Sequence, residues 1–287
     1  MKLARSVAGI AFPNPVLLAA GTAGFGREIA GVIRLERLGG LITKAVSLTP
    51  RAGNLAPRVA ELPGAMLNSI GLANPGVAHV TSAELPWLRQ HAPTLPVLVN
   101  VVGFTVEEYA SVIAALDDSP GHAGYEINLS CPNTSAGGVE FGADATSVDA
   151  VIAGCRRVTR RPLFAKLSPV LPNIPAIARA AKDAGADGVS LVNTMPGTAY
   201  DDDVPRLGNG FGGMSGPALR PVGLLAVRRT AEALPGFPII GVGGISRAVH
   251  VLDYLRAGAA LVAIGTAALA DPRLPERLVT ELEQADG

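Results

Sequence analysis

Short apolar runs alternate with amphipathic stretches along almost the whole chain, and this alternation restricts the fold more than any other feature. The eight runs carry apolar side chains at both alternating positions, as strands buried on both faces require. They cover residues 16–20, 41–45, 96–102, 125–129, 163–167, 188–192, 238–242 and 261–264. Residues 246–257 are one of the helical stretches, with Ser246 as the expected N-cap. Its expected apolar stripe consists of Val249, Leu252 and Leu255.

Eight strands that alternate with helices predict a single (β/α)8 TIM barrel. About 250 residues are typical of that fold, and the chain has 287. A doubly wound parallel sheet is the alternative, and it requires that two of the eight runs are not strands. The connections at residues 47–92 and 196–216 are too long for simple loops, so we expect insertions at the carboxyl ends of the strands. Residues 1–287 are expected to form one domain.

Composition excludes several classes of function. The chain has 24 basic and 24 acidic residues, which argues against a nucleic acid or an anionic membrane surface as its main partner. Its two cysteines, Cys131 and Cys155, are too few for a disulfide framework, a zinc site or an iron–sulfur cluster. No apolar run approaches the roughly 20 residues that span a bilayer. We therefore expect a cytoplasmic protein without a metal site.

Polar side chains and glycines stand at the ends of the predicted strands, where barrel enzymes carry their active sites. These residues are Lys44, Asn100, Asn128, Cys131, Lys166, Asn193, Thr194, Gly243, Gly244, Gly265 and Thr266. Lys44 and Lys166 interrupt otherwise apolar runs, which favours a functional role for both. Residues 125–133 read Tyr-Glu-Ile-Asn-Leu-Ser-Cys-Pro-Asn and place two carboxamides and a thiol at and beyond one strand end. The thiol of Cys131 is a candidate acid or base.

The glycines after the seventh and eighth strands predict a phosphate site. Backbone N–H groups freed by glycine beside helix N-termini bind phosphate well, and these two loops are the common phosphate site of barrels. Flavin mononucleotide (FMN) fits a rim of this kind, with its ring over the barrel mouth. Lys166 is the candidate cation at the flavin pyrimidine edge, where it would stabilise the anionic reduced form. The Gly-x-Gly-x-x-Gly pattern at residues 208–213 follows no strand, so it does not indicate a dinucleotide site.

Several motifs act together as a family signature. They are Thr-Lys-Ala-Val-Ser (43–47), Arg-Ala-Gly-Asn (51–54), Asn-Ser-Ile-Gly-Leu-Ala-Asn-Pro-Gly (68–76), Asn-Val-Val-Gly (100–103), Glu-Ile-Asn-Leu-Ser-Cys-Pro-Asn (126–133), Lys-Leu-Ser-Pro (166–169) and Met-Ser-Gly-Pro-Ala (214–218). Over residues 19–267 the chain resembles the class 1 dihydroorotate dehydrogenases, and it looks most like the catalytic subunit of subclass 1B. Three residues depart from the family pattern: Ala20 replaces a common serine, Val170 an asparagine and Met214 a leucine.

The resemblance implies FMN-dependent oxidation of (S)-dihydroorotate to orotate in de novo pyrimidine biosynthesis. Cys131 would remove a proton from C5 while a hydride passes from C6 to flavin N5, and Lys44 would contact both flavin and substrate. The implied substrate-binding residues are Lys44, Asn68, Ser69, Ile70, Gly71, Leu72, Asn128, Asn133, Asn193 and Thr194. The implied cofactor-binding residues are Ala20, Lys44, Ala45, Asn100, Asn128, Lys166, Val192, Gly216, Gly243, Gly244, Gly265 and Thr266. Residues 134–142 would form a mobile loop over the substrate.

The resemblance also implies a partner. Electrons would pass to NAD+ through a separate subunit that carries FAD and a [2Fe-2S] cluster, with a homodimer of this chain as the core of a heterotetramer. Alternatives are a class 1A-like enzyme that uses fumarate and a related FMN enzyme that acts on another pyrimidine such as uracil. A phosphate-binding lyase with Lys166 as a Schiff-base nucleophile and a non-catalytic binding protein are more distant alternatives.

Overall fold

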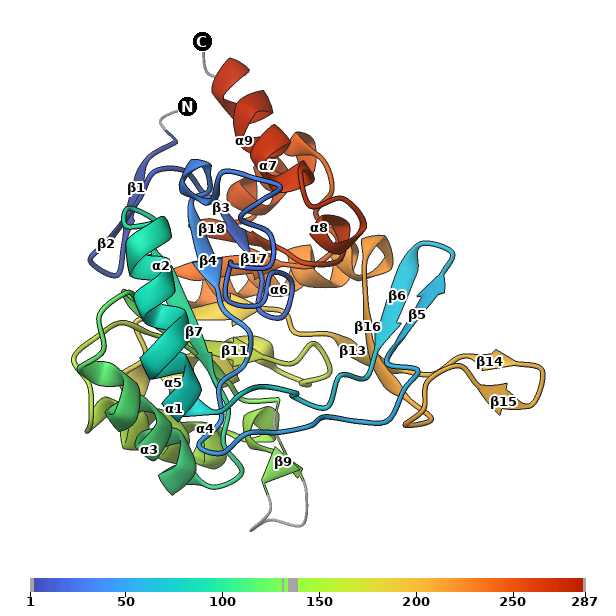
Figure 1. Ribbon diagram of the computed structural model, residues 1–287, viewed down its shortest axis with the longest axis horizontal. Coiled ribbons are helices and arrows are strands. Elements are labelled where there is room, and N and C mark those ends of the chain that lie inside the picture. Colours follow the sequence, from blue (N-terminus) through green and yellow to red (C-terminus); the bar gives the residue numbers. More distant parts are fainter. Residues whose placement is uncertain (1–2, 131, 134–138, 286–287) are drawn as a thin grey trace.

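Eight parallel strands close into a barrel at the centre of the computed structural model, which describes residues 3–130, 132–133 and 139–285 (Figure 1). The strands follow one another around the barrel in sequence order: β3 (Val16–Leu18), β4 (Gly40–Ile42), β7 (Val97–Val101), β8 (Gly124–Asn128), β11 (Leu163–Leu167), β12 (Gly188–Leu191), β17 (Ile239–Val242) and β18 (Leu261–Ile264). Strand β18 closes the ring on β3, with Val262 paired to Val16. Each predicted run overlaps one barrel strand, which confirms the (β/α)8 barrel and rules out the doubly wound sheet.

Apolar side chains fill the barrel toward the amino-terminal ends of its strands. Leu17, Leu98 and Phe164 are fully buried in one interior cluster. Gly188 begins β12 beside Phe164, and a Cβ atom there would lie 2.6 Å from the phenyl ring. The hairpin of β1 (Arg5–Val7) and β2 (Ile10–Phe12) closes this end, because Phe12 packs in the same cluster. The opposite, carboxyl-terminal mouth is left for polar residues.

Helices surround the barrel and bury one face against it (Figure 1). They are α1 (Val77–His79), α2 (Leu85–His91), α3 (Val106–Asp117), α4 (Ala145–Arg156), α5 (Ile174–Asp183), α6 (Arg220–Ala233), α7 (Ala248–Arg256), α8 (Thr266–Ala270) and α9 (Leu274–Gln284), with a π-helical turn at Val80–Glu84 and 3-10 turns at Leu35–Arg37, Phe141–Ala143 and Pro217–Leu219. The side chains of Thr105, Asp144 and Asn173 accept a hydrogen bond from the backbone N–H three residues on. These contacts satisfy donors that a helix start otherwise leaves unpaired.

Helix α7 differs from its predicted form. Its N-cap is Arg247, whose side chain makes no capping bond, so the expected cap at Ser246 is wrong. The helix buries Val251 and Tyr254, whereas Val249 of the predicted stripe is exposed. The Tyr254 hydroxyl donates a hydrogen bond of 2.8 Å to the carbonyl oxygen of Gly243. Tyr254 thus ties the buried face of the helix to the loop after β17, and the predicted stripe of Val249, Leu252 and Leu255 did not include it.

The two long connections pair with each other outside the barrel. The first contributes β5 (Val59–Leu62) and β6 (Ala65–Asn68), and the second contributes β13 (Met195–Gly197) and β16 (Gly212–Ser215). Together they form an antiparallel sheet in the order β13-β16-β6-β5, which we call the insertion sheet. The hairpin of β14 (Tyr200–Asp201) and β15 (Val204–Pro205) projects beyond it (Figure 1). The insertions predicted at the carboxyl-terminal face are thereby confirmed.

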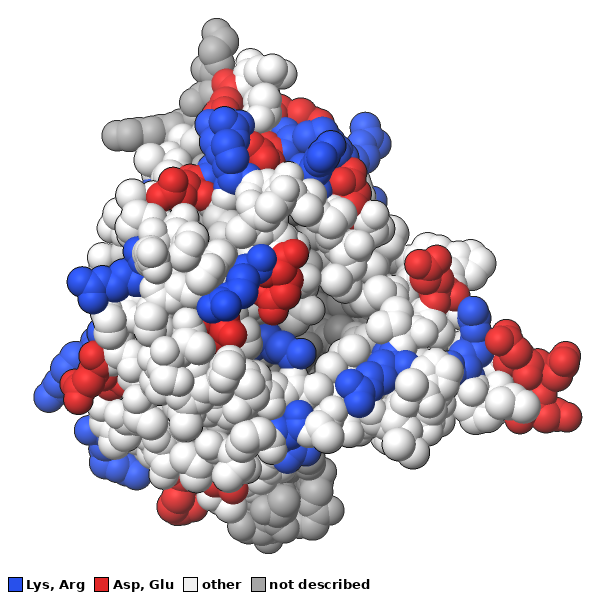
Figure 2. Space-filling model, in the orientation of Figure 1, with Lys and Arg blue, Asp and Glu red and all other residues white. Residues whose placement is uncertain are grey.

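The surface seen in Figure 2 carries basic and acidic side chains interspersed, and it is hollowed between the barrel and the insertion sheet.

Within the described residues, no helix is both long enough and apolar enough to cross a membrane. The same residues include no cluster of three or more histidine, cysteine, aspartate or glutamate side chains suited to a metal ion.

Candidate active site

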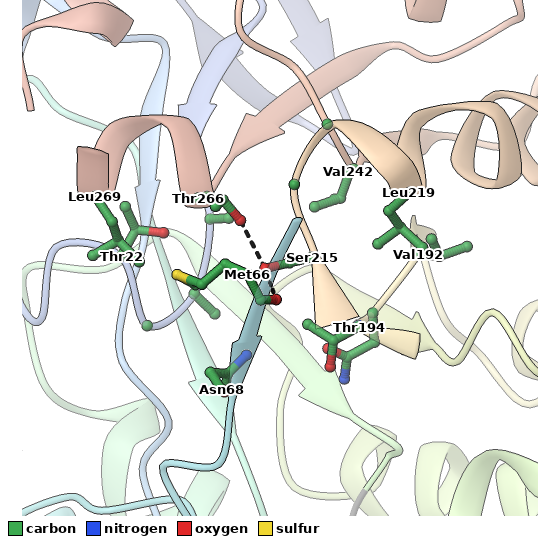
Figure 3. A pocket seen from close by; sticks show the side chains of 18 of the residues that line it. Thr22, Met66, Asn68, Val192, Thr194, Ser215, Leu219, Val242, Thr266 and Leu269 are labelled. Carbon is green, nitrogen blue, oxygen red and sulfur yellow. Dashed lines mark hydrogen bonds between the residues drawn. The ribbon is translucent and has the colours of Figure 1, made fainter. Parts of the chain in front are cut away.

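A cavity lies at the carboxyl-terminal mouth of the barrel, under the insertion sheet (Figure 3). Residues at the ends of five barrel strands form one side, and β6 and β16 form the other. The lining residues are Ala19, Ala20, Gly21, Thr22, Val59, Met66, Asn68, Ile70, Lys166, Val192, Asn193, Thr194, Ser215, Gly216, Leu219, Val242, Gly243, Gly244, Gly265, Thr266 and Leu269. The structure thus brings together most of the residues that were predicted from the strand ends.

Glycines form the wall of the cavity between β17 and β18. Gly243 and Gly244 have φ angles of +131° and +65°, which L-residues with a side chain rarely adopt. A Cβ atom on Gly244 would lie 2.7 Å from the Cβ of Arg220 and 2.9 Å from the carbonyl oxygen of Gly216. Gly265 lies in the adjoining loop and also lines the cavity. All four glycines, Gly216, Gly243, Gly244 and Gly265, line the cavity without a side chain, and we call them the glycine cradle.

Two hydroxyl groups connect the glycine cradle to the insertion sheet. The hydroxyl of Thr266 donates a hydrogen bond of 2.8 Å to the hydroxyl of Ser215, which lies 3.3 Å from the carbonyl oxygen of Met66 (Figure 3). Ser215 and Met66 belong to β16 and β6, so this chain of contacts ties the insertion sheet to the loop after β18. Ser215 was not predicted as a site residue.

Amide side chains gather at the other end of the cavity. The Asn193 side-chain N–H donates to the hydroxyl of Ser130 at 2.8 Å and to Oδ1 of Asn128 at 3.3 Å. Asn68 reaches the same region from β6, and its side chain donates to the carbonyl oxygen of Gly213 at 3.3 Å. Thr194 lies beside Gly213, where a Cβ atom would overlap its side chain. This end of the cavity therefore presents both hydrogen-bond donors and acceptors.

Lys166 reaches the cavity from inside the barrel. It is 7% exposed, and its ammonium nitrogen lies 3.3 Å from Oε1 of Glu126, with which it forms an ion pair. The side-chain N–H of Asn100 donates a hydrogen bond of 2.7 Å to the same carboxylate oxygen. Asn100 was predicted to bind the cofactor, and here it lies beneath the cavity lining, next to the carboxylate that pairs with Lys166.

Other predicted residues lie near the mouth but outside the cavity lining. Lys44 and Ala45 follow β4 and are half-buried, and the Lys44 backbone N–H donates to the carbonyl oxygen of Gly24 at 2.7 Å. Ser69 is buried, and its hydroxyl accepts a hydrogen bond of 2.7 Å from Asn54. Gly71 and Leu72 form a left-handed turn, with φ angles of +71° and +58°. Of the predicted 69–72 segment, the structure places Ile70 in the cavity lining.

The proposed base, Cys131, lies outside the described residues. Of Asn133 only the backbone is described, in β9 (Pro132–Asn133), which pairs with β10 (Val139–Glu140). Residues 134–138 of the predicted mobile loop also lie outside the described part. Phe141 is 1% exposed and packs edge-on against Tyr109, and Gly142 donates a hydrogen bond to the carbonyl oxygen of Leu129. The end of the segment that was expected to move is therefore packed against the barrel.

The second cysteine occupies a different environment. Cys155 is fully buried in α4, and burial raises the pKa of its thiol to about 12. Only the thiolate is an effective nucleophile or base. Cys155 is thus a packing residue.

Several lining residues were missed by reasoning from strand ends. Val59, Met66 and Ser215 lie on the insertion strands β5, β6 and β16. A signal for Met66 was present, because it lies two residues before Asn68 and alternate residues of a strand share a face. Thr22 and Leu269 belong to the segments after β3 and β18, and no sequence pattern singled them out.

Comparisons with known proteins agree with this architecture. The dihydroorotate dehydrogenase family model matches residues 2–285. A protein of Desulforudis audaxviator is 46% identical over 286 residues, which cover 99% of this chain and 92% of the relative. A protein of Pelobacter propionicus is 43% identical over 281 residues, covering 97% and 91%. Both relatives are named dihydroorotate dehydrogenase B (NAD+), catalytic subunit. The chain therefore belongs to the dihydroorotate dehydrogenase family of flavin-dependent oxidoreductases.

Proposed function

We propose that the chain is the catalytic subunit of an NAD+-linked dihydroorotate dehydrogenase and that it oxidises (S)-dihydroorotate to orotate with bound FMN. The observation that carries this proposal is one cavity that joins the glycine cradle, a buried lysine and a group of amide side chains. The names of the relatives add the substrate and the final acceptor.

The cavity fits FMN at both of its ends. At Gly244 of the cradle an added side chain would collide with Arg220 and Gly216. A wall without side chains lets a phosphate approach the backbone N–H groups, which is why we place the phosphate there. Ala20, Val192 and Thr266 line the same cavity as the cradle and Lys166. We place Lys166 at the pyrimidine edge of the flavin and Lys44, Ala45, Asn100 and Asn128 around the ring. Bound flavin supplies a two-electron acceptor for the hydride that leaves C6 of dihydroorotate.

The chain's own residues would bind and deprotonate the substrate. Dihydroorotate carries ring N–H groups, carbonyl oxygens and a carboxylate, and amide side chains offer partners for donors and acceptors alike. We assign ring and carboxylate binding to Lys44, Asn68, Asn128, Asn133, Asn193 and Thr194, with residues 69–72 as the adjoining turn. Cys131 would take the C5 proton, because a thiol pKa near 8.5 is readily tuned toward the working pH. The hydrogen bonds of Asn193 to Asn128 and Ser130 would preorganise this end of the site.

A second protein would complete the reaction. The chain contains two cysteines, whereas an iron–sulfur cluster uses about four, so we assign the cluster, together with the FAD, to a partner subunit. The word "subunit" in the names of the relatives supports this division of labour. We further propose that two copies of this chain form the core of a heterotetramer in the cytoplasm.

Acceptor specificity tests this function. The purified chain alone should reduce an artificial dye with dihydroorotate but form no NADH, and NADH formation should require an added electron-transfer subunit. Rapid NADH production by the single chain would reject the division into two subunits. Turnover with fumarate, and none with NAD+ and a partner, would support the class 1A-like alternative. Reduction of uracil without dihydroorotate oxidation would support an enzyme for another pyrimidine.

A further inference from the structure

A carboxylate lies inside the barrel directly next to the lysine of the cavity. Glu126, on β8, is 0% exposed, and it is bonded to two polar side chains through the same oxygen, Oε1. Lys166 approaches from β11 at 3.3 Å and Asn100 from β7 at 2.7 Å. Asn100 and Glu126 are directly paired in the strand register, so both point into the barrel. The three side chains form one buried group beneath the cavity, which we call the Glu126 cluster (Asn100, Glu126 and Lys166).

The hydrogen bonding of the Glu126 cluster is incomplete. Within the described part of the chain, Oε2 of Glu126 and Oδ1 of Asn100 are buried without a hydrogen-bond partner. A buried acceptor without a hydrogen-bond partner lowers stability, and a buried ion pair adds little to stability compared with packed apolar residues. The neighbouring layer of the barrel is filled by residues such as Phe164 and Leu98. The Glu126 cluster therefore contributes little to the stability of the barrel. Its position below the cavity indicates a role in the candidate active site.

We propose that Glu126 is a positioning residue that holds the Lys166 ammonium below the flavin and sets the reduction potential of the flavin by balancing that positive charge. This inference rests on the proposed function, because it requires a flavin in the cavity. The Lys166 ammonium stabilises negative charge on the reduced flavin, and the carboxylate of Glu126 opposes this effect at short range. Both groups are almost fully buried, so solvent and salt screen the opposition only weakly. The cluster would keep the flavin less easily reduced than an isolated lysine would.

Two substitutions separate charge from shape. Glu126→Gln removes the charge and keeps the size and the acceptor oxygen that bonds Lys166 and Asn100. Glu126→Asp keeps the charge and shortens the side chain. A matched control is Ser190→Ala, because Ser190 is fully buried, is paired in register with Lys166 and carries no charge. Each full-length variant is loaded with FMN, and its two-electron midpoint potential is measured anaerobically against a reference dye, with the flavin spectrum as readout.

We expect Glu126→Gln to raise the midpoint potential, with at least a tenfold larger equilibrium constant for flavin reduction, or about 30 mV for a two-electron couple. Glu126→Asp and Ser190→Ala should stay within threefold of the original chain. An unchanged potential in Glu126→Gln would overturn the proposal. Equal shifts in the Gln and Asp variants would also overturn it, as would loss of flavin from Glu126→Gln, because either result assigns Glu126 a purely structural role. An original chain without any flavin would reject the proposed function itself, which keeps the two failures distinct.

Discussion

Gly244 gives the sharpest test of the glycine cradle. The substitution Gly244→Ala adds one methyl group to a residue with a φ angle of +65°. A Cβ atom at this position would lie 2.7 Å from the Cβ of Arg220 and 2.9 Å from the carbonyl oxygen of Gly216. Real Cβ atoms essentially never approach other atoms this closely, so the loop after β17 or its neighbours must move.

The expected effect combines two costs. A left-handed conformation costs an L-residue with a side chain about 1–2 kcal/mol, and an extra methyl group in a closely packed place costs about 1–3 kcal/mol. If the cradle holds the flavin phosphate, the second cost appears in flavin binding, because relief of the overlap displaces the backbone N–H groups. At about 1.4 kcal/mol for each factor of ten, we expect flavin affinity to fall by roughly tenfold to a hundredfold.

Gly236 supplies the matched control. It has a φ angle of +78° and lies in an exposed loop between α6 and β17, and a Cβ atom added there would meet no other atom within 4 Å. Gly236→Ala should therefore lose about 1–2 kcal/mol of folding stability and keep its flavin affinity. Titration of each apoprotein with FMN, followed by flavin fluorescence, gives the two dissociation constants. Equal affinities for Gly244→Ala and Gly236→Ala would refute the assignment of the cradle to the phosphate.

Two further predictions concern a residue of the proposed reaction and a buried histidine. Cys131→Ser should lower turnover by roughly 10²–10⁴, the usual contribution of a general base, while FMN stays bound; unchanged steady-state turnover would remove Cys131 from the mechanism. Burial lowers the pKa of His122 from 6.5 to about 4, so the unfolded chain binds more protons between these pH values. Stability should therefore fall by up to about 3 kcal/mol as the pH drops from 6.5 to 4. In urea unfolding, His122→Gln should remove most of this dependence of the unfolding free energy on pH. The same pH profile in the variant and the original chain would contradict the role of His122.

The barrel could be predicted from the sequence because its strands are buried on both faces. A continuous apolar run marks such a strand without any knowledge of its neighbours, and all eight runs overlap a barrel strand. The predicted runs at residues 16–20 and 41–45 extend beyond β3 and β4, which end at Leu18 and Ile42. Ala19 and Ala20, which follow β3, line the cavity, and as apolar residues they cannot be distinguished by composition from the end of the strand.

The insertion sheet could not be predicted, because its partners are far apart in the sequence. Asn68 of β6 is paired with Gly213 of β16, and no local pattern specifies such pairing. Both connections were identified as long insertions, but their contact, and with it the placement of Met66 and Ser215 in the cavity, depends on the folded barrel. Sequence reasoning could name the strand-end residues of the site and not those that the insertions add.

Glu126 is a site residue that could have been predicted from the sequence but was not. It interrupts the apolar run at residues 125–129 as Lys44 and Lys166 interrupt theirs, yet it was not singled out as a site residue. The register places it beside Asn100 and within reach of Lys166. A charged residue in a doubly buried strand needs a partner, and a search for the partner of Lys166 among the other strands would have led to Glu126.

Anaerobic mixing of the FMN-loaded chain with dihydroorotate tests the central claim most directly. No partner subunit or final acceptor is needed, because only the first half of the reaction is observed. We predict that the oxidised flavin band near about 450 nm is lost on mixing and that one orotate forms for each flavin reduced. A yellow protein whose band persists in the presence of dihydroorotate would contradict the proposed substrate, and a chain that retains no flavin would contradict the proposed flavin site.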